Sequence, residues 1–156
     1  MTVWWITLAS SYLLCLVAGM NAKTVYSNGY YTKKYNKFFS FMSVAILVLV
    51  AGLRSGIGDT PTYIQGYKTD APSTIAGSIK LLFSGKKDAG FYFYQGILKS
   101  IVNNPNVFIF VTSLITIVLI FITYYKYSQL LELSVFLFIT TGCYLVTMNG
   151  IRQYLA

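Results

Sequence analysis

The chain has 156 residues, of which 56% are hydrophobic and 10% are charged, and its mean hydropathy is +0.61. Ordinary soluble domains carry about 25% charged residues, so this composition excludes a typical soluble domain, a disordered chain, collagen and a coiled coil. The 12 basic and 4 acidic side chains give a net charge of +8, but the basic residues lie between apolar blocks. That distribution argues against nucleic-acid binding, and the composition predicts a membrane protein.

Residues that usually bind metals or act as nucleophiles are scarce. The sequence has no histidine, and its two cysteines, Cys15 and Cys143, lie inside apolar runs. A zinc site and a disulfide framework are therefore not expected, and neither cysteine has the neighbouring cation that stabilises a thiolate. The glycine-rich loop of nucleotide-binding proteins is also missing, so we expect no cofactor, no metal and no ATP-driven reaction.

Four apolar segments come close to the ~20 residues that a helix needs to cross the hydrocarbon core. They cover residues 3–20, 38–53, 107–125 and 130–148. Asn104 and Pro105 predict the start of the third helix, because asparagine caps helices and proline is tolerated in the first turn. Glu132 lies near the start of the fourth, where a carboxylate favours a helix N-terminus. We expect an all-α polytopic membrane protein with about four transmembrane helices, in which residues 1–156 form a single transmembrane domain.

The basic residues of the first loop set the expected orientation. Lys23, Lys33, Lys34 and Lys37 have no acid among them, and the positive-inside rule places this loop in the cytoplasm. The N-terminus and residues 54–106 then lie outside. Six basic residues in that longer loop count against this orientation, although long loops are weaker topology signals. The tyrosines interleaved with the lysines fit an aromatic belt facing anionic membrane lipid better than a separate binding surface.

The outer loop begins with a glycine-rich stretch. Gly56 and Gly58 permit a tight backbone path, while Asp59 and Pro61 order the turn, as a pocket wall would require. The plainer reading is a simple turn in which Arg54 anchors the chain at the membrane interface. Both readings stay open at this point.

Two short helices are expected further along the outer loop. Residues 73–83 and 90–102 place apolar side chains at helical spacing, and both segments are too short to span a bilayer. We therefore predict two interfacial helices. The turn between them holds Lys86, Lys87 and Asp88, with the lysines expected in solvent or near lipid phosphates.

Two arginines and two carboxylates share the outer face in this topology. The planar forks of Arg54 and Arg152 suit a diphosphate, which a guanidinium binds through paired charge-assisted hydrogen bonds. A carboxylate, Asp59 or Asp88, suits the removal of a proton from an attacking sugar hydroxyl as an oxocarbenium-like centre forms. The sequence alone does not bring these four groups together.

Three motifs give the chain a family resemblance. They are G-L-R-S-G-I-G-D-T-x-x-Y at residues 52–63, D-A-G-F-Y at 88–92 and M-N-G-I-R-Q-Y-L-A at 148–156. In this order and spacing they resemble the EpsG family, whose members are Wzy-like bacterial membrane proteins taken to polymerise exopolysaccharide, capsule or O-antigen repeat units. The resemblance covers the chain from about the second span onward.

The family pattern implies further site residues. Its first motif matches Arg54, Gly58, Asp59 and Tyr63. Its last motif matches Asn149, Arg152 and Gln153. The middle motif usually has glutamate where this chain has Asp88, which shortens the reach by one methylene. The resemblance thus implies catalytic roles for Asp59 and Asp88, and substrate binding by Arg54, Arg152, Gln153, Asn149 and Tyr63.

The resemblance also implies an activity and its partners. The full-length protein would be a glycosyltransferase of the bacterial cell membrane that polymerises oligosaccharide units carried on undecaprenyl diphosphate, working with a flippase and a chain-length regulator. Family members have roughly ten or more spans, so we expect residues 1–156 to be the N-terminal part of a longer chain. An outer loop with surface helices and a catalytic acid is GT-C-like by analogy only.

Two other functions compete with polymerisation. A non-catalytic transporter or flippase for the same lipid-linked sugars would also want arginines facing a diphosphate, but we see no internal repeat of the kind such proteins usually have. An assembly subunit is favoured only if the natural chain ends at Ala156.

Overall fold

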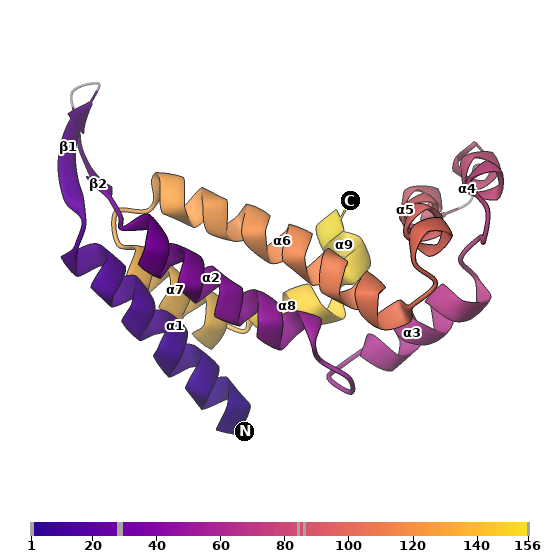
Figure 1. Cartoon of the computed structure of the whole chain (residues 1–156), viewed down its shortest axis with the longest axis horizontal. Helices are drawn as coiled ribbons and strands as arrows, with labels where there is room; N and C mark the ends of the chain where they lie inside the picture. Colours follow the sequence, from indigo (N-terminus) through magenta and orange to yellow (C-terminus); the bar gives the residue numbers. More distant parts are fainter. Residues whose placement is uncertain (1, 28–29, 84, 86, 156) are drawn as a thin grey trace. The chain divides into compact units, whose positions relative to one another are not determined.

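In the computed structural model the chain is almost entirely helical (Figure 1). The structure describes residues 2–27, 30–83, 85 and 87–155, so Lys86 of the charged turn and Ala156 of the third motif lie outside the described residues. The elements are α1 (Thr2–Met20), β1 (Lys23–Ser27), β2 (Tyr30–Lys34), α2 (Lys37–Gly52), α3 (Thr60–Thr69), α4 (Ile75–Leu82), α5 (Ala89–Ile101), α6 (Pro105–Tyr127), α7 (Leu131–Thr140), α8 (Cys143–Asn149) and α9 (Ile151–Leu155).

The chain forms two compact units. The first unit contains Met1–Val50 and Ile117–Leu145, and the second contains Ala51–Thr116 and Val146–Ala156. Every candidate site residue named above belongs to the second unit. Each unit has its own internal packing, and the single transmembrane domain expected over residues 1–156 stays a prediction.

Small and aromatic side chains hold the first unit together. The Cys15 thiol donates to Ser43 Oγ at 3.1 Å, and the Ser43 hydroxyl donates to the carbonyl of Ser11 at 3.1 Å, so α1 and α2 pack closely. The Tyr144 hydroxyl donates to the Leu47 carbonyl at 2.6 Å, which fixes the start of α8 against α2. Both cysteines are free, and these contacts give Cys15 a packing role.

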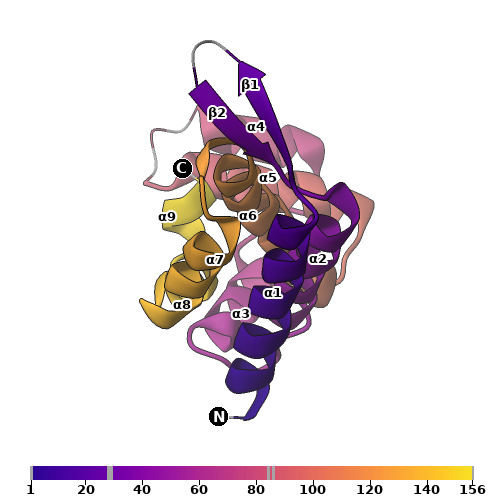
Figure 2. The ribbon, with the colours of Figure 1, turned by 90° about the vertical axis from the view of Figure 1, so that its left-hand side faces the viewer.

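The first loop forms an antiparallel hairpin, which the aromatic-belt prediction did not include. Lys23 pairs with Lys34 and Ser27 with Tyr30 across β1 and β2, and the ribbon joins the end of α1 to the start of α2 (Figure 2). Valine, threonine and tyrosine favour strands. An Asn-Gly pair at positions 28 and 29 of the sequence is a hairpin signal that the belt interpretation overlooked.

The helices support a membrane protein. Among the described residues, two helices are long and apolar enough to cross a bilayer, α1 and α6, or three if the bent pair α7 and α8 counts as one span. The prediction of a continuous fourth helix over residues 130–148 is wrong, because α7 and α8 meet at 57° and Gly142 between them has a φ of +82°. α2 is apolar but has only 16 residues, so a count of four spans stays a prediction.

The predicted start of α6 is confirmed. Pro105 is its first residue, and the side-chain Oδ1 of Asn104 accepts a hydrogen bond from the Asn106 amide at 2.9 Å. This is the bond an N-cap asparagine makes to the second helical residue. Glu132 likewise lies in the first turn of α7, as predicted.

Three short helices, α3, α4 and α5, belong to the second unit. α4 and α5 confirm the helices predicted over residues 73–83 and 90–102. α3 was not predicted, because the glycines before it and the proline in its first turn were attributed to a turn over residues 53–67, although Pro61 is a common helix N-terminal residue. Gly96 lets α5 approach α4, since a Cβ there would overlap the side chain of Ser78 and lie 2.9 Å from Pro72.

The core of the second unit is aromatic. Tyr67 of α3 stacks on Phe108 of α6, with ring centroids 4.8 Å apart, and both side chains are at most 1% exposed. Tyr63, Ala71, Ile109 and Ile151 complete the buried cluster. This cluster fixes α3, α6 and α9 together and so positions the residues of the first and third motifs.

Candidate functional site

An ion pair joins the middle and last motifs. Nη1 of Arg152 lies 2.9 Å from Oδ2 of Asp88, and the two side chains are 46% and 35% exposed. Asp88 precedes α5 with a φ of +62°, a left-handed conformation that aspartate tolerates better than most residues, and its carbonyl accepts the amides of Phe91 and Tyr92. The backbone turn therefore aims the Asp88 carboxylate at Arg152.

Two aromatic rings contact the guanidinium of Arg152. Its guanidinium carbon lies 6.0 Å from the ring centroid of Tyr63 and 5.8 Å from that of Phe91. Both distances are typical of cation–π contacts, which favour a positive charge over a ring face. The hydrogen bond with Asp88 is the main cause that raises the pKa of Arg152. The site thus contains a permanently charged guanidinium that contacts two aromatic rings and forms an ion pair with the carboxylate of Asp88.

The first and last motifs meet at Asn149. The Tyr63 hydroxyl donates to the Asn149 carbonyl at 2.9 Å. Gly58 has a φ of +56°, and a Cβ there would overlap Oδ1 of Asn149, so glycine is required both for the backbone conformation and for the space. Oδ1 of Asn149 is buried and accepts no hydrogen bond from the residues the structure describes.

Arg54 is buried among protein atoms. It is 7% exposed, its Nε donates to Thr60 Oγ1 at 2.9 Å, and its Nη2 donates to the Met148 carbonyl at 3.0 Å. Its Nη1 donates to the Ala51 carbonyl at 2.6 Å and to Ser113 Oγ at 3.0 Å. These bonds tie the end of α2 to α3, α6 and the end of α8. The role of Arg54 in holding a diphosphate stays a prediction, while its structural role follows from these contacts.

The structure does not bring all the sequence candidates together. Asp88, Arg152, Tyr63 and Asn149 form one connected group through the contacts above. Asp59 is exposed before α3, and its side chain makes no capping hydrogen bond. Gln153 is exposed, and its backbone N–H donates to the Gly150 carbonyl.

A polar cavity of about 300 Å³ lies beside this group. Tyr63, Phe91 and Arg152 contribute to its wall, which also contains polar residues that the sequence analysis did not select as site residues, three of which matter below. These are Asp70, Tyr92 and Gln95. Gln95 had a detectable signal, because it is a polar side chain between the aromatic residues 91–94 and the apolar residues 97 and 98 of α5. Asp70 had none, since an aspartate after a helix is a common turn residue.

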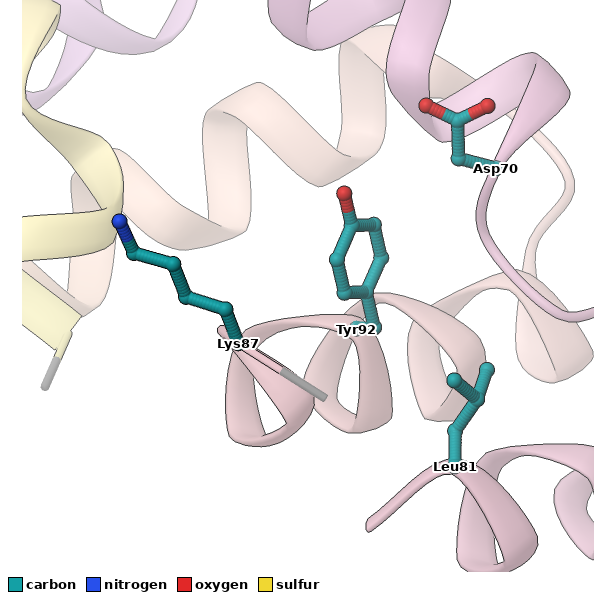
Figure 3. Close-up of a pocket in the computed structure, with 4 residues that line it drawn as sticks. All are labelled: Asp70, Leu81, Lys87 and Tyr92. Atoms are coloured by element: carbon teal, nitrogen blue, oxygen red, sulfur yellow. The ribbon is translucent and has the colours of Figure 1, made fainter. Parts of the chain in front are cut away.

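A second cavity, of about 480 Å³, shares part of that wall. Asp70, Leu81, Lys87 and Tyr92 line it, and Figure 3 shows the Tyr92 ring rising between the side chains of Lys87 and Asp70. Because Asp70 and Tyr92 line both cavities, the two spaces adjoin. Each volume falls within the range of about 300–1,000 Å³ typical of small-molecule sites.

The donor set suits anionic and hydroxyl-bearing ligands. In the part of the chain that the structure describes, no three His, Cys, Asp or Glu side chains come together. What the cavity offers is a guanidinium, a carboxylate, an amide and aromatic rings. An arginine fork binds phosphate oxygens, and the remaining groups bind hydroxyls and the apolar faces of sugar rings.

Comparison with known proteins assigns the family. The EpsG family model matches residues 37–156, a region that includes all three motifs and every site residue named above. No curated protein and no solved structure matches the chain. Since the matched region covers well over half of the sequence, the chain belongs to the EpsG family.

Proposed function

We propose that the full-length protein polymerises oligosaccharide repeat units carried on undecaprenyl diphosphate, during synthesis of a bacterial exopolysaccharide. Membership of the EpsG family supports a polymerase-like role in this pathway. The observation that carries the proposal is the Asp88–Arg152 ion pair, in which Arg152 contacts aromatic rings and lines a polar cavity. We place the reaction on the outer face of the cell membrane, in the topology with the N-terminus and residues 54–106 outside.

Arg152 is the residue we assign to the diphosphate. Its side chain is 46% exposed and contacts Asp88 through Nη1, so its other N–H groups suit paired hydrogen bonds with phosphate oxygens. Those oxygens gain negative charge as the glycosidic bond to the carrier breaks. Asp88 holds the guanidinium in place, which reduces the freedom that Arg152 would lose on binding substrate. Asp88 thereby acts as an orienting group, and Asp59 is the other sequence candidate for a catalytic carboxylate.

The remaining family positions surround this pair. Tyr63 supplies a ring under Arg152 and binds the Asn149 carbonyl. Asn149 has a buried amide oxygen, and Gln153 is exposed one residue after Arg152. We assign these three side chains to contacts with the sugar or the diphosphate. Arg54 stabilises the same region by donating a hydrogen bond to the Met148 carbonyl, next to Asn149.

Substituting Arg152→Lys in the full-length protein should shorten the polymer made in cells and reduce its amount by about tenfold or more. Lysine keeps the charge but loses the planar fork, and removing one transition-state hydrogen-bond donor typically costs about 10²–10³ in rate. Polymer length and yield are measured by gel electrophoresis of cell extracts, at matched protein levels.

The reverse change at a cation of the first unit is the control. Lys126→Arg, at the end of α6, should leave the polymer unchanged, because Lys126 is in neither cavity wall described above. A polymer of normal length and yield from the Arg152→Lys strain contradicts the role of Arg152.

A further inference from the structure

Gln95 brings a buried, unsatisfied amide to the cavity beside Arg152. Its side chain is 2% exposed, and its Oε1 accepts no hydrogen bond from any residue within the described ranges. A buried acceptor without a partner is unfavourable, because it has lost its hydrogen bonds with water and gained none in the protein. Since Gln95 is part of the cavity wall, a ligand that donates a hydrogen bond there would satisfy the amide, which turns about its last torsion at little cost.

Asp70 also lines this cavity, and the backbone around it is held by several hydrogen bonds. Its amide donates to the Gly66 carbonyl at 2.8 Å, and Lys99 Nζ donates to the carbonyls on either side of this turn, those of Lys68 and Ala71, at 3.0 and 2.8 Å. The helix end that carries Asp70 is therefore held firmly. A cation at this position also complements the C-terminal end of the α3 dipole.

The carboxylate of Asp70 has one oxygen free for a ligand. Oδ1 accepts the Thr69 hydroxyl at 2.7 Å, whereas Oδ2 accepts no bond from the described residues and lies 3.8 Å from where a Cβ on Gly66 would be. Thr69 and Gly66 line the same cavity. The glycine leaves room beside Oδ2.

The cavity therefore has two chemically different parts. Arg152 attracts anions, while the carboxylate of Asp70 repels them and accepts hydrogen bonds from hydroxyls. The rings of Tyr63, Phe91 and Tyr92 provide apolar surface between these polar groups. Neutral sugar rings match this combination, because they carry hydroxyl donors around their edges and C–H groups on their faces.

We propose that this cavity binds the acceptor sugar of the reaction, with Gln95 fixing a hydroxyl or N-acetyl group and Asp70 accepting the proton of the attacking hydroxyl. The assignment rests on the proposed function and names the acceptor subsite within it. Of the three aspartates, it assigns the role of general base to Asp70, because Asp70 lines the same cavity as Arg152. Asp88 already binds Arg152, and Asp59 is not among the described residues of that cavity wall.

The bond changes balance without any co-reactant. The acceptor hydroxyl oxygen bonds to the anomeric carbon of the donor sugar, and the bond from that carbon to the diphosphate breaks. The electron pair of the broken bond leaves with undecaprenyl diphosphate, whose added charge faces Arg152. The hydroxyl proton passes to the Asp70 carboxylate, which returns it to solvent.

The test separates sugar binding from turnover in the purified full-length protein. The probe for binding is the repeat-unit oligosaccharide released from its lipid carrier by mild acid, and turnover is followed as extension of lipid-linked repeat units in detergent. Gln95→Leu removes the amide, and Tyr92→Phe removes the hydroxyl that Tyr92 brings to the walls of both cavities. Each variant should weaken oligosaccharide binding by about three- to tenfold, the value of one hydrogen bond. Tyr127→Phe is the matched control, because Tyr127 is 80% exposed at the end of α6, and it should bind like the wild type.

Asp70→Asn should keep oligosaccharide binding within about threefold and lower the extension rate by about 10²–10⁴, as expected for loss of a general base. Wild-type binding by both Gln95→Leu and Tyr92→Phe overturns the subsite. If Gln95→Leu fails to fold, Tyr92→Phe decides alone. A normal extension rate in Asp70→Asn, with extension lost instead in Asp59→Asn, overturns the role of Asp70.

Failure of the proposed function gives a different result. A wild-type protein that binds the released oligosaccharide, with the binding weakened in Gln95→Leu, but extends no lipid-linked unit, contradicts polymerisation and leaves the sugar subsite supported.

Discussion

Replacing Arg54 with alanine is expected to destabilise the second unit by about 3 kcal/mol or more. The change removes the donors to two main-chain carbonyls, those of Ala51 and Met148, and to the hydroxyls of Thr60 and Ser113. Each buried acceptor left without a partner costs about 1–3 kcal/mol, and bonds from a charged donor are the stronger kind. The measurement is the free energy of unfolding of the purified protein in detergent, by denaturant titration.

The second arginine is a matched control for this prediction. Arg152→Ala removes an ion pair that is nearly half exposed, and such pairs contribute about 0–1 kcal/mol. We therefore expect Arg152→Ala to leave stability almost unchanged while reducing polymer synthesis. An Arg54→Ala protein as stable as the wild type would contradict the structural role. Loss of polymer in a fully stable Arg54→Lys protein would favour the predicted contact of Arg54 with diphosphate.

Gly58→Ala should destabilise the protein by about 2–5 kcal/mol, through two separate effects. An L-residue in the left-handed conformation costs about 1–2 kcal/mol, and a Cβ that forces a neighbour to move adds about 1–3 kcal/mol. The neighbour here is Asn149, whose Oδ1 occupies the space in question. Thermal unfolding and polymer length of the variant both report the effect.

Gly85 separates the two contributions. Its φ is +66°, close to that of Gly58, but no atom of the described residues lies within 4 Å of a Cβ built there. Gly85→Ala should therefore show only the backbone cost of about 1–2 kcal/mol. Adding Asn149→Ala to Gly58→Ala should recover part of the lost stability, because it removes the overlapping oxygen. Equal stability losses in Gly58→Ala and Gly85→Ala would contradict the proposed contact with Asn149.

Local sequence patterns predicted where helices form more accurately than how those helices pack together. The apolar periodicity around α4 and α5 and the cap at Asn104 are local features, and the structure confirms them. The break at Gly142 was missed because apolar residues continue through it, and composition does not distinguish a straight helix from a bent pair. The hairpin and α3 were missed because aromatic, lysine and glycine patterns were attributed to the membrane interface and to turns.

The candidate site was predictable only in part, for a physical reason. The sequence identified Arg152 and Asp88, which are 64 positions apart in the chain. In the structure Nη1 of Arg152 lies 2.9 Å from Oδ2 of Asp88. The same motifs identified Arg54, but chain position does not indicate that its guanidinium is buried against the Met148 carbonyl. Asp70 and Gln95 belong to no recognised motif. Their relevance comes from the cavity wall they share, which only the packing of α3, α5 and α9 creates.

The most direct test of the central claim is chain extension by the purified full-length protein. Lipid-linked repeat units in detergent are supplied without nucleotide and without a membrane compartment, and the products are separated by length. We expect a ladder of longer lipid-linked chains with the wild-type protein and its near absence with Arg152→Lys. Unchanged repeat units with the wild-type protein, together with movement of the same units across reconstituted vesicles, would contradict polymerisation and favour transport.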